Sequence, residues 1–109
     1  MSEIPTVEAA DLPDDAVVVD VREPQEWAAG HAPGAVHIPL GDVPARLDEI
    51  PSTDDSLPIV CRSGGRSERA VQWLLQQGFD VVNVRGGMRA WHGAGKSMTT
   101  DCGQEPTVL

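Results

Sequence analysis

One cysteine stands at the start of a short segment rich in glycine and arginine, residues 61–67. It follows a short apolar run, residues 58–60, and precedes residues 67–77, whose apolar side chains recur with the period of a helix. A cysteine between a strand and a helix lies where the first backbone N–H groups of the helix have no partner. The segment consists of Cys61, Arg62, Ser63, Gly64, Gly65, Arg66 and Ser67.

This segment predicts a loop that binds negative charge around Cys61. Gly64 and Gly65 allow backbone conformations closed to other residues, so several N–H groups can point inward. The anion held there could be the cysteine's own sulfur, because such surroundings lower the pKa of a thiol. We therefore expect the Cys61 sulfur to be ionised, nucleophilic and open to reagents. The alternative for any lone cysteine is a small buried apolar side chain; the glycines and arginines favour the anion-binding loop.

Two arginines of the segment are candidates for holding an anionic ligand. The guanidinium groups of Arg62 and Arg66 match the oxygens of sulfonate-like groups, although each is equally suited to pointing into solvent. A phosphate-binding Walker loop is excluded, because the sequence contains no G-x-x-x-x-G-K-[ST] motif. The residues alone therefore predict an anion-binding loop with a nucleophilic cysteine.

The elements that must position this loop alternate between strand and helix. Val17–Val21 is a nearly continuous apolar run, which is typical of a strand buried on both faces. Strand-like and helix-like patches at short spacing predict an α/β domain with a mostly parallel sheet. The expected strands are residues 4–7, 17–21, 35–38, 57–61 and 81–84, and the expected helices are 9–10, 23–30, 42–50, 67–77 and 88–94.

Length and composition indicate one domain over residues 1–95, followed by a tail over 96–109 that lacks periodicity and is expected to be loosely ordered. The formal net charge of −9 argues against nucleic acid and anionic membranes as partners. No apolar run reaches the roughly 18 residues that span a membrane, and the N-terminus lacks the layout of a secretory signal, so we expect a cytoplasmic protein. Five of the eight lysines and arginines lie between residues 62 and 89, where they could still attract a small anion.

The second thiol and two of the histidines are given no catalytic role. A Cys61–Cys102 disulfide is possible by number, but cytosolic thiols are normally reduced. Cys102 lies in the tail and is either an incidental or a resolving thiol. His31 and His37 do not have the spacing of a zinc site, and no C-x-x-C pair occurs, so no bound metal is expected.

The sequence also resembles a known protein family. Residues 61–67 are similar to the active loop of single-domain rhodaneses. The segments 19–23, 30–39 and 85–87, the last followed by Trp91, resemble further landmarks of that family in the same order and spacing. The resemblance covers roughly residues 4 to 95 and implies a three-layer α/β/α fold, doubly wound around a five-stranded, mostly parallel sheet.

The resemblance also implies an activity, that of a sulfurtransferase. Cys61 would take the outer sulfur of thiosulfate or another persulfide donor, hold it as a persulfide, and pass it to cyanide, a thiol or a protein acceptor. The backbone N–H groups of residues 62–67 would stabilise the thiolate and the persulfide. Asp20 and Arg22 would support the site, chiefly as a structural ion pair. No metal or organic cofactor is implied, and the small size favours a monomer.

Other functions remain open at this point. Rhodanese-like domains also serve as protein-binding modules or as sulfur relays without thiosulfate activity. Cysteine phosphatases of the same fold carry Cys-x5-Arg, whereas Arg66 stands one position nearer to Cys61, giving Cys-x4-Arg. This shorter loop leaves fewer N–H groups for three phosphate oxygens. Arsenate reduction is a further use of related folds.

Overall fold

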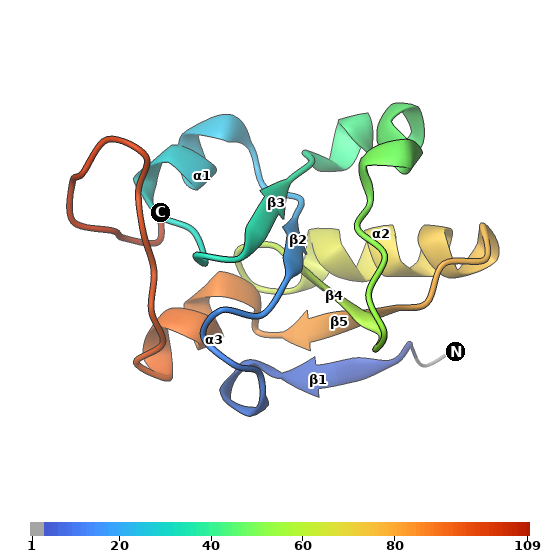
Figure 1. The fold of residues 1–109 in the computed structure, drawn as a ribbon, viewed down its shortest axis with the longest axis horizontal. Coiled ribbons are helices and arrows are strands. Elements are labelled where there is room, and N and C mark those ends of the chain that lie inside the picture. Colours follow the sequence, from blue (N-terminus) through green and yellow to red (C-terminus); the bar gives the residue numbers. More distant parts are fainter. Residues whose placement is uncertain (1–3) are drawn as a thin grey trace.

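The computed structural model describes residues 4–109, and its elements alternate between strand and helix as expected (Figure 1). No helix within residues 4–109 has both the length and the apolar character needed to cross a membrane. The strands are β1 (Thr6–Glu8), β2 (Val18–Asp20), β3 (Ala35–His37), β4 (Leu57–Val60) and β5 (Val81–Arg85). The α-helices are α1 (Pro24–Ala29), α2 (Gly65–Gln76) and α3 (Gly87–Gly93), and the 3-10 helices are η1 (Ala9–Asp11) and η2 (Leu40–Glu49).

The five strands form one sheet in the order β1-β5-β4-β2-β3, and all four pairings are parallel. The expected five-stranded α/β sheet is thus confirmed. Strand β4 lies in the middle of the sheet, where Ile59 pairs with Val19 of β2 and with Asn83 of β5. The loop that begins at Cys61 therefore starts from the centre of the carboxyl edge, which is where ligands bind in open α/β sheets.

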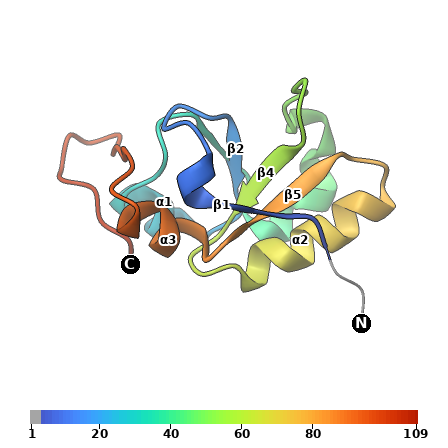
Figure 2. The same ribbon diagram turned by 90° about the horizontal axis from the view of Figure 1, so that it is seen from below.

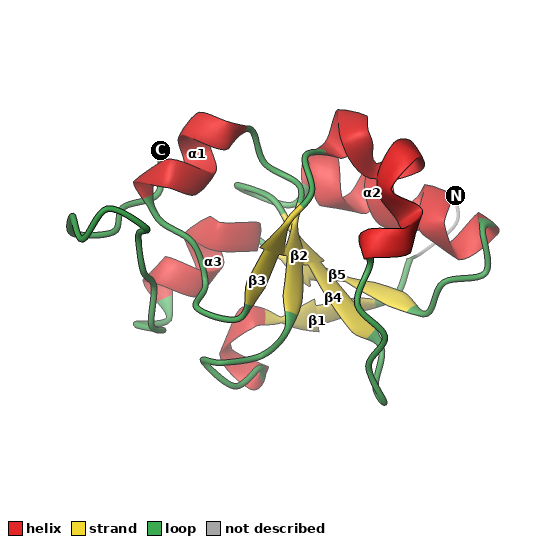
Figure 3. Cartoon of the chain, turned by 45° about the horizontal axis from the view of Figure 1, so that its top comes forward, coloured by secondary structure: helices red, strands yellow, loops and turns green. Residues whose placement is uncertain are grey.

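Helices cover both faces of the sheet, as Figures 2 and 3 show. Successive residues of a strand face opposite sides, and β4 follows this rule. Ile59 packs with Val71 and Leu74 of α2, whereas Val60 packs with Met88 and Trp91 of α3. Each fully buried aliphatic side chain contributes about 1.5–3 kcal/mol, so the two packed layers hold the central strand and its following loop in place.

Two expected helices differ in detail from the structure. Residues 42–50 were expected to form one helix, but η2 is a 3-10 run that is interrupted by non-helical backbone at Arg46 and contains Pro44, which has no backbone N–H to donate. The helix expected over 67–77 begins two residues earlier, at Gly65, since Gly64 enters it in a left-handed conformation. The helix expected over 23–30 is α1, with Pro24 in its first turn.

Residues 96–109 contain no helix or strand, yet they contact the domain at several points. His31 and Thr99 exchange two backbone hydrogen bonds of 3.0 and 2.8 Å. The Thr107 N–H donates to the Ala29 carbonyl at 2.8 Å, and Val108 packs against the apolar layer beneath α3. Figure 1 shows this segment in red beside α1. The contacts place the end of the chain next to α1, near the loop that follows β4.

Candidate active site

The backbone of the loop after β4 is fixed by the start of α3. The N–H of Met88 donates to the Cys61 carbonyl at 2.7 Å, and the N–H of Arg89 donates to the Arg62 carbonyl at 3.0 Å. Two consecutive carbonyl groups of the loop therefore face α3. This arrangement leaves the following N–H groups free to turn toward the Cys61 side chain.

Gly87 makes this docking possible. A Cβ atom at Gly87 would lie 2.3 Å from the Cys61 carbonyl oxygen and 2.9 Å from that of Arg62, well inside van der Waals contact. Gly87 also has φ of +56°, in the left-handed region. In the sequence, Gly87 stands out only as part of the family landmark 85–87; the structure shows that its lack of a side chain lets α3 approach the loop.

The Cys61 sulfur accepts hydrogen bonds from its own loop. The Gly64 N–H lies 3.0 Å from Sγ and the Ser67 hydroxyl oxygen lies 3.4 Å from it. Burial alone would raise the pKa of Cys61, but the Ser67 hydroxyl and the backbone N–H groups of Ser67, Gly64 and Ser63 outweigh it, so the pKa lies below its ordinary value. Of the inward-facing N–H groups expected from the sequence, that of Gly64 lies within hydrogen-bonding distance of Sγ, and those of Ser63 and Ser67 also lower the pKa of Cys61.

The expectation that the sulfur is open to reagents is wrong for this structure, because Cys61 is only 1% exposed. The residue belongs to the same apolar layer as Ile59 and Val71, and Leu40 packs against that layer. A sulfur, phosphate or arsenic compound therefore reaches Cys61 only after neighbouring groups move. The burial also strengthens each hydrogen bond to the sulfur, since little water competes with it.

Of the two candidate arginines, Arg66 is the one that forms an ion pair with α1 and is influenced by the charge of Cys61. Its guanidinium forms a two-point ion pair with Glu26 of α1, with N–O distances of 2.6 and 2.8 Å. The hydrogen bond to Glu26 is the main cause that raises the pKa of Arg66, and the charge of Cys61 raises it further. The same hydrogen bond lowers the pKa of Glu26 to about 2. Arg62 is exposed instead, and its Nε donates to the Leu109 carbonyl.

The two adjacent glycines of the loop have different roles. Gly64 has φ of +115°, a conformation that L-residues avoid, and its N–H is the one that bonds to Sγ. Gly65 is an ordinary first residue of α2, and a Cβ atom there would meet nothing within 4 Å. The backbone freedom that the sequence assigned to both glycines is used by Gly64.

Asp20 and Arg22 form a fully buried ion pair at the carboxyl end of β2. Arg22 Nη2 lies 2.8 Å from Asp20 Oδ2, Nε donates to the same carboxylate, and Nη2 also donates to the Gly30 carbonyl at 2.7 Å. The pair thus joins β2 to the turn after α1. His37 Nε2 contacts the Arg22 carbonyl at 2.8 Å, and both His31 and His37 stack on Trp27, so these histidines pack rather than gather into a ligand set.

Asn83 belongs to the site and was not identified from the sequence. Its side-chain oxygen lies 2.5 Å from the Ser67 hydroxyl, and the residue is 5% exposed. A signal did exist, because Asn83 interrupts the run Val81–Val84 within a strand that reads as buried on both faces. A polar residue at such a position requires a buried hydrogen-bond partner, and here that partner is Ser67.

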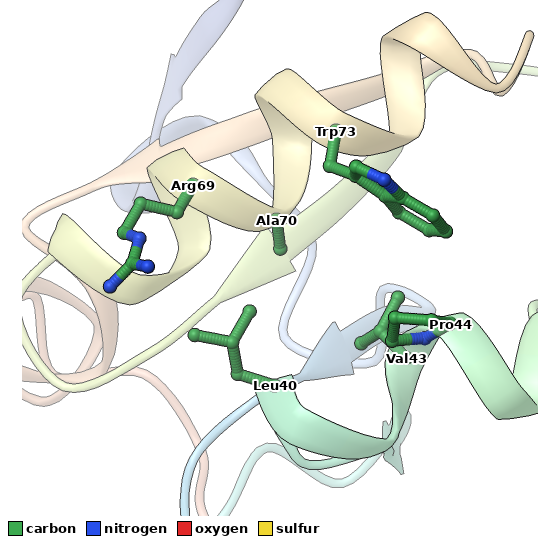
Figure 4. Close-up of a pocket in the computed structure, with 6 residues that line it drawn as sticks. All are labelled: Leu40, Val43, Pro44, Arg69, Ala70 and Trp73. Atoms are coloured by element: carbon green, nitrogen blue, oxygen red, sulfur yellow. The ribbon is translucent and has the colours of Figure 1, made fainter.

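A groove lies between η2 and α2, on the helix that follows the loop (Figure 4). Figure 4 shows the Arg69 side chain at one end and the Trp73 ring at the other, above Leu40, Val43 and Pro44. Arg69 is exposed and has no carboxylate partner among the described residues 4–109. It therefore differs from Arg66, which lies one turn earlier and is paired.

Comparison with known proteins agrees with this geometry. A Bacillus subtilis (strain 168) protein named "Putative sulfurtransferase YtwF" is 42% identical over 89 residues, covering 82% of this chain and 85% of that protein. An Allochromatium vinosum protein named "Sulfurtransferase" is 46% identical over 79 residues, covering 72% of this chain and 73% of that protein.

A solved structure and a family description give the same result. The crystal structure of a rhodanese-related protein from Thermoplasma volcanium matches with a TM-score of 0.79 and 31% identity, covering 89% of this chain and 99% of that chain. Residues 6–94 match the family described as Rhodanese-like domain. The match spans every strand, the loop around Cys61 and helix α3. The chain therefore belongs to the rhodanese-like domain family.

Proposed function

We propose that the protein is a sulfurtransferase that carries sulfane sulfur on Cys61, from thiosulfate or another persulfide donor to a thiophilic acceptor. The observation that carries this proposal is the hydrogen bond from the Gly64 N–H to the Cys61 sulfur, with the Ser67 hydroxyl within reach of the same sulfur, since donors at this position favour the thiolate. Membership of the rhodanese-like family and the names of the two relatives support sulfur transfer as the type of reaction.

The first half-reaction is a displacement at sulfur. The Cys61 thiolate attacks the outer sulfur of thiosulfate, a new S–S bond forms to Cys61, and the old S–S bond breaks. The electron pair of the broken bond leaves with sulfite, and Cys61 is left as a persulfide anion. In the second half-reaction an acceptor nucleophile bonds to the outer sulfur, and the electron pair returns to the Cys61 thiolate. With cyanide as acceptor the product is thiocyanate, and ping-pong kinetics follow.

The loop stabilises negative charge in both resting states of this cycle. The N–H of Gly64 and the other inward-facing donors are fixed by the docking on α3 and by helix α2 before any ligand arrives. Fixed donors of this kind stabilise charge without reorganising during the reaction. The thiolate and the persulfide anion differ by one sulfur atom, so the same donors serve both.

Arg66 is the residue that we expect to recognise the negative charge of an anionic sulfur donor. Its guanidinium lies close enough to Cys61 for the sulfur's charge to raise the pKa of Arg66, while its fork is occupied by Glu26. A sulfonate group that approaches Cys61 competes with the Glu26 carboxylate for this fork, because both present two oxygens in one plane. Binding of thiosulfate would therefore loosen the contact between α1 and the loop.

The experiment is intact-mass analysis of a Cys102→Ser protein, in which Cys61 is the only cysteine. The protein is incubated with thiosulfate or with an organic persulfide, and then with cyanide. We expect a gain of one sulfur atom that cyanide removes as thiocyanate, and no gain in a Cys61→Ser control. No gain from either donor, or an equal gain in the control, would overturn the proposal. Hydrolysis of an aryl phosphate that depends on Cys61 would assign the site to a phosphatase instead.

The two donors also separate an enzyme that uses thiosulfate from a sulfur relay. If the organic persulfide loads Cys61 with sulfur and thiosulfate does not, the Cys61 persulfide is supported as the carrier and thiosulfate is excluded as the donor. Loading by thiosulfate with steady turnover in cyanide would support the transferase activity as stated. Initial rates measured against both substrates test the ping-pong order.

A further inference from the structure

The Ser67 hydroxyl group lies among three possible acceptors but has only one proton to donate. Its oxygen is 3.4 Å from the Cys61 sulfur, 3.1 Å from the Gly64 carbonyl oxygen and 2.5 Å from the Asn83 side chain. Ser67 is fully buried and Asn83 is 5% exposed, so bulk water has little part in this arrangement. The neighbour that receives this proton determines whether Ser67 donates a hydrogen bond to the sulfur or presents only its lone pairs to it.

The Gly64 carbonyl is the weakest competitor for that proton. It already accepts the N–H of Glu68 at 2.9 Å as part of the first turn of α2. The contact between Ser67 and Asn83 is shorter by 0.6 Å than that to Gly64, since the two distances are 2.5 and 3.1 Å. The hydroxyl rotor is therefore controlled chiefly by Asn83 and by the sulfur.

The Asn83 amide can act on Ser67 in two ways. A half-turn of the amide exchanges its oxygen and its NH2 group without changing its shape. With the amide oxygen toward Ser67, the hydroxyl donates to Asn83 and offers only lone pairs to Cys61, which suits a neutral S–H. With the NH2 group toward Ser67, Asn83 donates to the hydroxyl oxygen and the hydroxyl proton turns to the sulfur, which suits a thiolate or a persulfide anion.

We propose that Asn83 is a positioning residue that sets the direction of the Ser67 hydroxyl and thereby stabilises the ionised Cys61 sulfur. In the ionised state, Asn83, Ser67 and Cys61 form a chain of two hydrogen bonds in which each bond polarises the next. Asn83 does not touch the sulfur in this arrangement, so it acts entirely through Ser67. The inference requires only that Cys61 ionises, and it holds whatever sulfur donor the protein uses.

The charged groups around Cys61 come from several elements, and a substitution of Asn83 removes none of them. Arg66 of α2 lies near the sulfur, and Glu26 of α1 pairs with it. Asp20, paired with Arg22, lies at the end of β2, beside Val60 of β4 in the sheet. From α3 the Arg89 backbone N–H contacts the loop. Asn83 is itself uncharged, so its removal changes hydrogen bonding without removing a charge.

The test is an ultraviolet titration of the thiolate in a Cys102→Ser background. Cys61 is then the only thiol, and the chain has no tyrosine whose ionisation would overlap the signal. The titration needs no reagent to reach the buried sulfur and no sulfur donor, so its outcome is independent of the mass experiment on sulfur loading. The variants are Asn83→Leu, Asn83→Asp, Ser67→Ala, and Asn83→Leu combined with Ser67→Ala.

We expect Asn83→Leu to raise the apparent pKa of Cys61 by about one unit, as the loss of a hydrogen bond that supports a charge requires. Asn83→Asp should raise it further, because a carboxylate can only accept the Ser67 proton and adds negative charge. Ser67→Ala should also raise it, and adding Asn83→Leu to Ser67→Ala should raise it no further. A thermal melt of each variant checks that it is folded.

Two results would overturn the inference. One is a titration of Asn83→Leu, or of Asn83→Asp if the leucine variant does not fold, that coincides with the parent. The other is a shift from Asn83→Leu that persists at full size in the Ser67→Ala background, since Asn83 would then act on the sulfur by another route. If Asn83 has only a structural role, its variants should have a lower melting temperature and an unchanged thiolate titration. That result would contradict the proposal.

Discussion

Glu26 and Arg66 form a two-point ion pair that joins helix α1 to the loop around Cys61. The Glu26 carboxylate also accepts the Glu23 backbone N–H at 3.0 Å, as part of the capping box of α1. One carboxylate therefore links the start of α1 to Arg66, whose pKa the charge of Cys61 also raises.

The first prediction concerns the pH dependence of stability. The pKa of Glu26 is about 2 in the folded protein, compared with 4.5 ordinarily. Because the folded pKa is the lower one, the ionised Glu26 stabilises the folded state above about pH 4.5, and this contribution is lost as the pH falls toward 2. Urea unfolding of Glu26→Gln should therefore show a lower free energy of unfolding than the parent at pH 7, with a difference that shrinks below pH 4.5.

The matched control is Glu49→Gln. Glu49 pairs with Arg46 in the same two-point manner, and this hydrogen bond lowers the pKa of Glu49, but the pair is exposed to solvent. Exposed pairs contribute little to stability, so the effect at pH 7 should be smaller than for Glu26→Gln. A difference between Glu26→Gln and the parent that does not change with pH would contradict the assignment.

The second prediction separates the roles of two arginines on α2. Arg66→Ala should lower kcat/KM for thiosulfate by about tenfold or more, since a hydrogen bond to a charged group contributes roughly 1.5–3 kcal/mol. The loss should be smaller for an uncharged sulfur donor. Arg69→Ala removes a cation one turn away that has no carboxylate partner in the structure of residues 4–109, and it should leave both rates near those of the parent. Equal losses for the two donors in Arg66→Ala would show that Arg66 does not bind the donor's charge.

The third prediction compares the adjacent glycines of the loop. Gly64→Ala places a side chain at φ of +115°, which costs about 1–3 kcal/mol of stability, and should also weaken the N–H contact to Sγ. Gly65→Ala fills open space at the start of α2 and should be neutral or slightly stabilising. Urea unfolding and the thiolate titration of both variants measure these effects. Equal destabilisation by the two substitutions would mean that the left-handed conformation is not what the loop requires.

Much of the fold could be predicted because its signals are local. The runs Val17–Val21 and Val81–Val84 are rich in valine, each with one polar residue, and they coincide with β2 and β5 of the parallel sheet. The helix after Cys61 is predicted by the spacing of Ala70, Val71, Leu74 and Leu75; the first three are buried in α2 together with Ser67, whereas Leu75 is exposed. The short glycine-rich connection between that strand and helix is the local signal that predicts Cys61 at the carboxyl edge of the sheet.

The contacts that complete the site could not be predicted, because they join segments far apart in the sequence. Glu26 and Arg66 are 40 residues apart, and Ser67 and Asn83 are 16 apart. The register that places Asn83 beside Ile59 depends on the pairing of β4 with β5, which no local pattern specifies. The burial of Cys61 likewise results from the packing of several elements around one sulfur.

The fourth prediction tests whether the docking of α3 shapes the loop around the sulfur. Gly87→Ala would bring a methyl group to 2.3 Å from the Cys61 carbonyl oxygen, so α3 and the loop must separate. The carbonyls of Cys61 and Arg62 would then lose their partners, Met88 and Arg89, and the N–H groups opposite them would no longer be held toward Sγ. We expect a destabilisation of about 2 kcal/mol or more together with a higher apparent pKa of Cys61.

Gly93→Ala is the control within the same helix, because a Cβ atom there meets nothing within 4 Å. It should keep the parent's titration and should raise stability slightly, as alanine does when it replaces glycine in a helix. If Gly87→Ala lowers stability but leaves the Cys61 titration unchanged, the loop holds its N–H groups inward without α3. In that case the left-handed Gly64 and the first turn of α2 would be sufficient to ionise the sulfur.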